Sequence, residues 1–270
     1  MQLEELMSDP SITDLVINGS QAFALIDGVW RRSGPTLELE ALSRLASELC
    51  ALGGRHIDYA NPFADVSVSG FRVHAVLGAG VAQQPAISIR RHSRRTVPVP
   101  RELQEIVKKR ENFLVTGGTG AGKTTLLRSM LAGLEERVIT IEDVGELELT
   151  IGNCVALVSR QPNVEGRGGV GVEQLFREAL RMRPDRLVLG EVRGAEFALM
   201  LQALNTGHAG SAATMHANGL EAIRSRLIGL GALAGLTAEA TVNLSRTAIQ
   251  KVIHLDVKGV RVANLGDLLD

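Results

Sequence analysis

The stretch Gly117-Gly-Thr-Gly-Ala-Gly-Lys-Thr-Thr125 directly follows the apolar run Phe113-Leu-Val115. It fits the pattern G-x4-G-K-[ST], and Thr125-Leu-Leu-Arg-Ser-Met-Leu131 continues it with helical spacing. Glycines let successive backbone N–H groups turn toward a phosphate, and the helix that follows adds its positive N-terminal end. The stretch therefore predicts a phosphate-binding loop between a buried strand and a helix.

A loop of this kind indicates that ATP and Mg²⁺ are the cofactors. Lys123 should reach the β- and γ-phosphates, and the Thr124 hydroxyl should bind Mg²⁺. The residues expected to contact the nucleotide are those of the loop itself: Gly117, Gly118, Thr119, Gly120, Ala121, Gly122, Lys123, Thr124 and Thr125.

The sequence around this loop predicts two domains. Residues 1–95 show short alternating runs and one helical pattern, which indicates a small α+β domain. A linker follows at residues 96–102. From residue 103 to residue 270, apolar β-rich runs alternate with helical patterns, which is typical of a mostly parallel sheet covered by helices.

Carboxylates end two of the predicted strands of the second domain. Arg186-Leu-Val-Leu-Gly-Glu191 ends in Glu191, and Val138-Ile-Thr-Ile-Glu142 continues into Asp143 and Glu146. The carboxyl ends of parallel strands line the ligand crevice, so Glu191 can face the metal, directly or through water. At least one acid of the group Glu142, Asp143 and Glu146 is expected to orient or deprotonate the attacking water.

Two histidines and several arginines complete the candidate site. His208 and His216 flank the predicted strand Ser211–Met215, where they can sense phosphate or remain ordinary structural histidines. Their spacing, without a local third ligand, is weak evidence for zinc, and we expect none. Arg72, Arg90 and Arg91 can neutralise phosphate charge or form a solvated edge.

Composition restricts the classes of protein to which the chain can belong. Of the 270 residues, 45% are hydrophobic and the net charge is −1, which opposes disorder and a general nucleic-acid coat. Cys50 and Cys154 form no C-x-x-C pair, which favours buried thiols in a reducing compartment. The sequence shows no signal peptide and no apolar run near the roughly 18 residues that a membrane span needs.

Five motifs in order resemble the ATPases of type II and type IV secretion and pilus assembly. They are GGTGAGKTT, TIEDVGELEL, QPNVEGRGG, LRMRPDRLVLGEVRGAE and LNTGHAGSAATMHAN. Together with SGFRVHAVL and PAISIRRHS they look most like the CpaF/TadA branch, which drives Tad (Flp) pili. The chain differs by having Gly78-Ala79-Gly80 where prolines are common, and it begins almost at the N-terminal domain, without the longer leading segment expected of many relatives.

The resemblance implies a role for each candidate residue. Glu146 corresponds to the water-activating base, Glu191 to the atypical Walker B acid, and His208 and His216 to the "His box". Arg72, Arg90 and Arg91 match N-terminal-domain positions implicated in nucleotide contact. The family fold is a RecA-like P-loop NTPase core with a smaller α+β N-terminal domain, and the active form is a homo-hexamer.

The sequence thus predicts a Mg-dependent P-loop ATPase that powers a Tad or type IV-like pilus, or secretion across the inner membrane. We expect it to be cytoplasmic, peripheral at the inner face of the cytoplasmic membrane, with platform proteins as partners. Two alternatives remain: the ATPase of a conjugative or type IV protein-secretion apparatus, and a nucleic-acid motor of similar core. The second is disfavoured because the only aromatic residues after the predicted linker, Phe113, Phe176 and Phe197, lie in apolar patterns.

Overall fold

The computed structural model describes residues 3–33, 36–92, 95–162 and 165–270. It divides into two compact units, Met1–Ser93 with Arg160–Gly169, and Arg94–Ser159 with Val170–Asp270. The sequence predicts a boundary at residue 95 and assigns residues 160–169 to the second domain, whereas these residues group with the first unit. Residues 163 and 164, inside the QPNVEGRGG motif, lie outside the described residues.

The first unit is an antiparallel sheet with one long helix. Its described strands pair in the order β3-β2-β1-β6-β5-β4. The elements are α1 (Leu3–Leu6), β1 (Ile12–Asn18), β2 (Gln21–Ile26), β3 (Val29–Arg32), α2 (Leu39–Leu52), β4 (Phe63–Val68), β5 (Phe71–Val76) and β6 (Ala86–Arg91).

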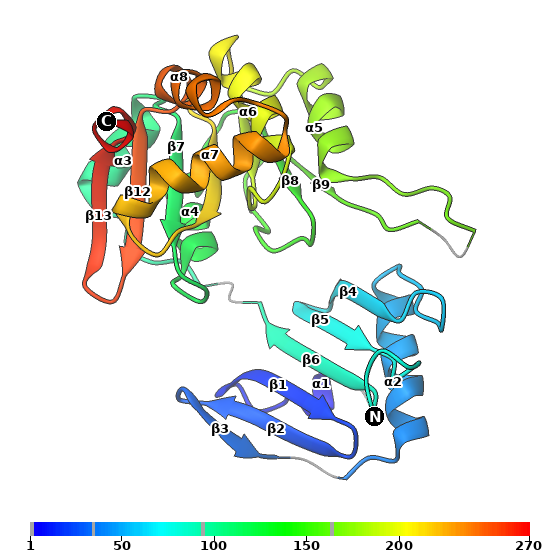
Figure 1. Ribbon diagram of the computed structural model, residues 1–270. Coiled ribbons are helices and arrows are strands. Elements are labelled where there is room, and N and C mark those ends of the chain that lie inside the picture. The colour runs from blue at the N-terminus through cyan, green and yellow to red at the C-terminus, as the bar shows by residue number, and fades with distance from the viewer. Residues whose placement is uncertain (1–2, 34–35, 93–94, 163–164) are drawn as a thin grey trace. The chain divides into compact units, whose positions relative to one another are not determined.

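Alternation along these strands separates a buried face from a polar face. Ile17, Ile87 and Val73 are fully buried in one core cluster with Leu42 of α2, which runs beside the sheet in Figure 1. The intervening residues of the strands point to the other face, and there Arg90 is exposed. The predicted α+β pattern therefore follows from a period-2 arrangement packed against one amphipathic helix.

The second unit contains a largely parallel sheet. Over the described residues its strand order is β13-β12-β7-β11-β10-β8-β9, and β13 pairs antiparallel with β12. The elements are α3 (Arg101–Lys108), β7 (Phe113–Gly117), α4 (Lys123–Leu131), β8 (Val138–Glu142), β9 (Cys154–Val158), α5 (Val172–Arg181), β10 (Arg186–Leu189), α6 (Glu196–Asn205), β11 (Ala212–His216), η1 (Leu220–Ala222), α7 (Ile223–Leu233), α8 (Ala238–Ala248), β12 (Lys251–Asp256), β13 (Gly259–Asn264) and α9 (Leu265–Leu269).

Helices cover both faces of this sheet. Leu114 and Met215 lie in a core cluster with residues of α5, α6 and α7, whereas Phe113 and Val115 pack with residues of α3 and α4. Figure 1 shows α7 and α8 on one side of β7 and β12. Strands buried on both faces explain why β7, β8 and β10 read as continuous apolar runs.

The carboxyl ends of the central strands define one edge of the sheet. His216 of β11 pairs with Gly117 of β7, and β8 and β10 lie parallel to them. The segments that follow β7, β8, β10 and β11 therefore leave the sheet at the same edge. This edge carries the P-loop and most of the predicted site residues.

Candidate functional site at the P-loop edge

The P-loop forms a glycine-lined turn between β7 and α4. Gly120 and Gly122 have φ angles of 73° and 89°, which L residues with side chains rarely adopt. A Cβ on Gly118, Gly120 or Gly122 would meet nothing within 4 Å, so the space beside the loop is open. Because α4 begins at Lys123, its N-terminal N–H groups and the loop face the same space. The loop therefore fits a phosphate group.

Lys123, His216 and Glu191 form a chain of contacts at this edge. The Lys123 Nζ donates to the carbonyl oxygens of Gly117 at 3.1 Å and Gly118 at 2.8 Å, and lies 3.4 Å from His216 Nδ1. The other ring nitrogen of His216, Nε2, lies 3.2 Å from Glu191 Oε1. The second carboxylate oxygen of Glu191 accepts from Arg193 at 2.6 Å. His216 thus lies between the cation and the carboxylate.

The electrostatics of this chain favour a neutral imidazole. Burial, followed by the positive charge of Lys123, lowers the pKa of His216 below 6.5, while Glu191 acts in the opposite direction. Burial also lowers the pKa of Lys123, and again Glu191 opposes the shift. A neutral His216 can accept at one ring nitrogen and donate at the other.

For Mg²⁺ the oxygen ligands predicted from the sequence are the Thr124 hydroxyl and the Glu191 carboxylate. Thr124 is the second residue of α4, and Glu191 follows Gly190 directly after β10. Hard oxygen donors with room for water suit Mg²⁺, which keeps several of its waters when bound. The predicted pair therefore has the chemistry for this ion.

The loop after β8 brings the other acids to the same edge. Glu142 is 4% exposed, and its Oε1 accepts from the backbone N–H groups of Glu146 and Leu147, each at 3.0 Å. Burial raises the pKa of Glu142 to about 7, although these hydrogen bonds lower it. Glu146 is half-buried, and its negative charge raises the pKa of Lys123. Glu142 is thus covered by the loop that carries Glu146.

His208 lies at the opposite edge of the sheet from His216. It precedes β11, with a φ of 58°, and its Nδ1 lies 3.4 Å from the carbonyl oxygen of Pro184, just before β10. Ser211 donates to the His208 carbonyl oxygen at 2.6 Å. The strand β11 therefore separates the two histidines, and within this unit only His216 is brought to Lys123.

Arg72, Arg90 and Arg91 belong to the first unit, where each has partners. Arg72 pairs with Asp65 at 2.6 Å and Arg90 with Asp14 at 2.7 Å. Arg72 and Arg90 also face each other across β5 and β6. Arg91 donates to the carbonyl oxygens of Met7, Asp9 and Ile12 and lies over the Phe71 ring. Their role at the nucleotide stays a prediction.

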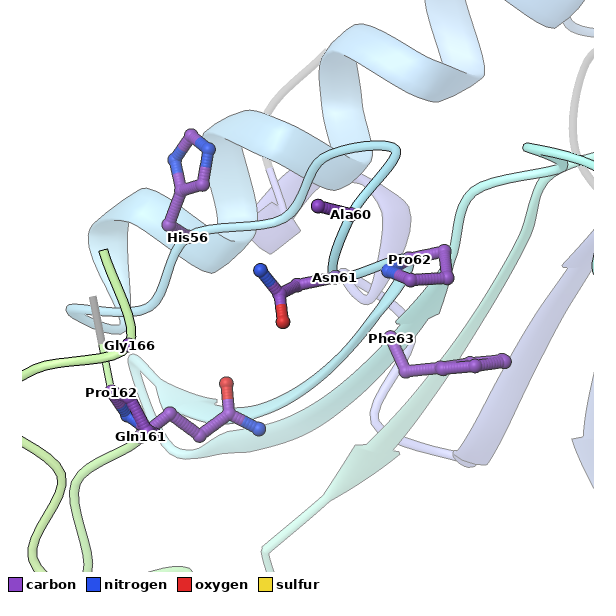
Figure 2. Close-up of a pocket in the computed structure, with 8 residues that line it drawn as sticks. All are labelled: His56, Ala60, Asn61, Pro62, Phe63, Gln161, Pro162 and Gly166. Atoms are coloured by element: carbon purple, nitrogen blue, oxygen red, sulfur yellow. The ribbon is translucent and has the colours of Figure 1, made fainter. Parts of the chain in front are cut away.

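A pocket of about 640 Å³ lies elsewhere, in the first unit (Figure 2). It is lined by His56, Ala60, Asn61, Pro62, Phe63, Gln161, Pro162 and Gly166. Among these described lining residues, none belongs to the predicted nucleotide site. The phosphate site is thus an open edge of the second unit rather than this pocket.

Two arginines of the site were not predicted from the sequence. Arg193 binds Glu191, and the buried Arg128 of α4 donates to backbone carbonyl oxygens of the loop after β8. Arg128 has a sequence signal, because it interrupts the apolar run Leu126-Leu-Arg-Ser-Met-Leu131 of a buried helix. Arg193 has only its spacing of two residues from Glu191.

Comparison with known proteins decides the family. Residues 90–259 match the family model described as "Type II/IV secretion system protein". The chain belongs to the type II/IV secretion system protein family. The match covers the P-loop, the acids after β8 and β10, and both histidines.

Curated relatives of this family include proteins of conjugation and type IV secretion. A Mycobacterium tuberculosis protein provisionally named as a conjugal transfer protein is 41% identical over 94% of this chain and 79% of its own length. Conjugal transfer protein TrbB of Rhizobium radiobacter is 29% identical over 72% of this chain and 61% of its length. Type IV secretion system protein VirB11 of Bartonella quintana is 41% identical over 43% and 33% of the two chains.

Solved structures confirm the fold class. The pilus retraction motor PilT with bound ADP aligns with a TM-score of 0.66 at 22% identity, covering 97% of this chain and 80% of that one. The VirB11 ATPase of Brucella suis aligns at 0.53 and 23%, covering 97% and 94%. The mixed α/β fold with an N-terminal domain and a RecA-like core is therefore confirmed. Membership of the type II/IV secretion system protein family agrees with the prediction of a P-loop ATPase.

Across the parts of the chain that the structure describes, no single helix is long and apolar enough to cross a membrane. The pair Leu220–Leu233 and Ala238–Ala248, bent by 113°, passes that test only when the two helices are counted together.

Proposed function

We propose that this chain hydrolyses Mg·ATP and uses the free energy to drive a type II/IV secretion-family machine. The observation that carries the proposal is the chain of contacts from Lys123 through His216 to Glu191 at the P-loop edge. It joins the phosphate-binding lysine, the candidate γ-phosphate sensor and the candidate metal-side acid in one constellation.

Each residue has a part that its position supports. The P-loop N–H groups and Lys123 bind the β- and γ-phosphates, and Thr124 with Glu191 holds Mg²⁺, directly or through water. The ion, when bound, neutralises phosphate charge. Glu146 orients and deprotonates the attacking water, and neutral His216 reports whether the γ-phosphate is present. Arg72, Arg90 and Arg91 supply positive charge from the N-terminal domain.

The proposed active form is a homo-hexamer at the inner face of the cytoplasmic membrane, bound to inner-membrane platform proteins. The proposal also places the protein in the cytoplasm. It assigns residues 1–95 to an N-terminal domain and residues 103–270 to an ATPase domain. Hexameric assembly would allow positive charge to reach a nucleotide from the same subunit or from its neighbour.

Two kinds of machine are candidates for the process that ATP hydrolysis drives. The names of the relatives favour a conjugative or type IV secretion apparatus, because conjugal transfer proteins and VirB11 are among them. The motif set resembles the CpaF/TadA branch, which favours assembly of a Tad pilus. Deletion in the source organism separates them: loss of surface pili supports the Tad candidate, and loss of DNA or effector transfer supports the other.

Purified protein tests the activity itself. We expect phosphate release from Mg·ATP by the wild type and a loss of at least about 100-fold in Lys123→Ala, because the variant lacks the phosphate-binding cation. Equal rates in both proteins, or no release at any protein concentration, would overturn the proposal. Strong stimulation of ATP hydrolysis by DNA would instead support the alternative function, a nucleic-acid motor.

A further inference from the structure

Two buried ionisable groups, an acid and an arginine, hold the loop that carries Glu146. From the end of β8, Glu142 Oε1 accepts the N–H groups of Glu146 and Leu147, each at 3.0 Å. From α4, Arg128 Nε donates to the Leu147 carbonyl oxygen at 2.7 Å, and its Nη2 donates to the Glu146 carbonyl oxygen at 2.5 Å. The backbone N–H and C=O groups of Glu146 and Leu147 are therefore all hydrogen-bonded.

This arrangement, the Arg128–Glu142 clamp, fixes the backbone on each side of the Glu146 Cα. Arg128 is 8% exposed and Glu142 is 4% exposed, so these charge-assisted hydrogen bonds lie largely away from water. The side chain of Leu147 is fully buried in a core cluster that also contains Leu127 of α4. The direction in which Glu146 leaves the loop is thus set from both sides of the backbone.

Arg128 adds a connection that Glu142 cannot supply. It lies on the helix whose first residue is Lys123 and whose N-terminus faces the P-loop space. The phosphate site and the Glu146 backbone are therefore attached to one rigid element. A guanidinium carries N–H donors on separate nitrogens in one fixed plane and can bind two neighbouring carbonyls in a set geometry, whereas the three donors of a lysine ammonium share one freely rotating nitrogen.

We propose that Arg128 is a positioning residue for hydrolysis, which holds the Glu146 carboxylate in register with the phosphate bound at the start of the same helix. The inference rests on the proposed function, in which Glu146 activates water. Arg128 itself contacts no substrate: it acts through the backbone of Glu146. General-base catalysis requires such register, because a displacement of about 1 Å can cost on the order of 100-fold in rate.

A double-mutant cycle tests this role. Hydrolysis is measured for the wild type, Arg128→Lys, Glu146→Gln and the double variant, by steady-state and single-turnover release of labelled phosphate. We expect Arg128→Lys to lower kcat by about 10-fold or more while KM changes by less than about 3-fold. In the Glu146→Gln background the same substitution should change the rate by less than about 2-fold, because the group that it positions is gone.

Controls separate positioning from loss of structure. Arg177→Lys on α5 changes an exposed arginine that pairs with Glu173 at 3.8 Å, and it should keep wild-type kcat and Tm. If Arg128→Lys fails to fold, Glu142→Met opens the clamp from the other side with little change in volume. It should show the same drop in kcat and the same loss of effect in the Glu146→Gln background.

The outcomes distinguish this inference from the proposed function. Equal drops in kcat with and without Glu146 would overturn the positioning role and leave hydrolysis intact. An unchanged kcat in Arg128→Lys would do the same. A wild type without turnover, or a Glu146→Gln variant as fast as the wild type, would instead refute the assignment of Glu146 as the base.

Discussion

At the scale of single residues, Glu142 combines burial with hydrogen bonds that its ionised form needs. Burial raises its pKa from 4.5 to about 7, against the effect of the two N–H groups and of Arg128. The folded state therefore holds the proton more tightly than the unfolded chain does. The contribution of Glu142 to stability is fully present below pH 4.5 and is lost as the pH rises from 4.5 through 7. The loss amounts to about 3 kcal/mol.

Glu142→Gln should remove this dependence, because an amide keeps an acceptor oxygen but does not ionise. We expect the variant to be more stable than the wild type at pH 8, with Tm higher by roughly 5 to 10 °C. The difference should shrink toward zero at pH 5. Thermal unfolding of both proteins by circular dichroism between pH 5 and 8 measures it. A Tm difference that does not vary with pH would contradict the assigned pKa.

His216 and His208 show what the sequence can place at this scale. Both belong to one motif, but a residue that ends a parallel strand and one that precedes it lie at opposite edges of the sheet. His216 is the last residue of β11 and contacts Lys123, whereas His208 lies before the strand, near Pro184. The placement of His216 follows from strand direction alone. The hydrogen-bond partners of Arg128 do not, because they depend on the path of the loop after β8.

At the scale of secondary structure, the contact of β10 with β8 sets the position of Glu142. A Cβ on Gly190 would lie 2.7 Å from Glu142 Cγ and 2.9 Å from its Oε1. Only glycine therefore lets Glu142 occupy its place beneath the end of β10. The two residues of the Gly-Glu pair therefore have separate roles. Gly190 leaves room for Glu142, and Glu191 supplies a carboxylate.

Gly190→Ala should accordingly destabilise the second unit by about 1 to 3 kcal/mol through overpacking. The matched control is Gly229→Ala in α7, where a Cβ meets nothing within 4 Å and the helix gains up to about 1 kcal/mol from the lower entropy of the unfolded chain. Urea unfolding measures both midpoints. Equal midpoints for Gly190→Ala and the wild type would show that the close contact with Glu142 is not a constraint.

Most elements of the parallel sheet were predictable, because strands buried on both faces produce continuous apolar runs. The two carboxyl-terminal strands, β12 and β13, were not predicted. β13 has exposed or half-buried residues throughout, and β12 joins the sheet by pairing with β7, more than a hundred residues earlier in the chain. Such long-range pairing leaves no local pattern. The strand order of the sheet could not be predicted from the sequence for the same reason.

At the scale of the whole molecule, the P-loop edge of the second unit is held by contacts within its own unit. The Lys123 ammonium donates to two carbonyl oxygens of its own loop, and Glu191 is bound by His216 and Arg193. A nucleotide must exchange these contacts for phosphate and Mg²⁺. Residues 90–259, which match the family model, include this edge. A ring of subunits would close it with positive charge from N-terminal domains, as proposed above.

Assembly should therefore depend on bound nucleotide, and it can be measured without turnover. Glu146→Gln, which should bind Mg·ATP and hydrolyse it slowly, is examined by sedimentation velocity with and without Mg·ATP. We expect a species of about six times the chain mass of 28.8 kDa with nucleotide, and smaller species without it. Lys123→Ala with Glu146→Gln should stay small in both conditions, because it lacks the phosphate-binding cation. A mass equal to one chain at every protein and nucleotide concentration would exclude the ring, and with it any part for Arg72, Arg90 and Arg91 at a neighbouring subunit's nucleotide.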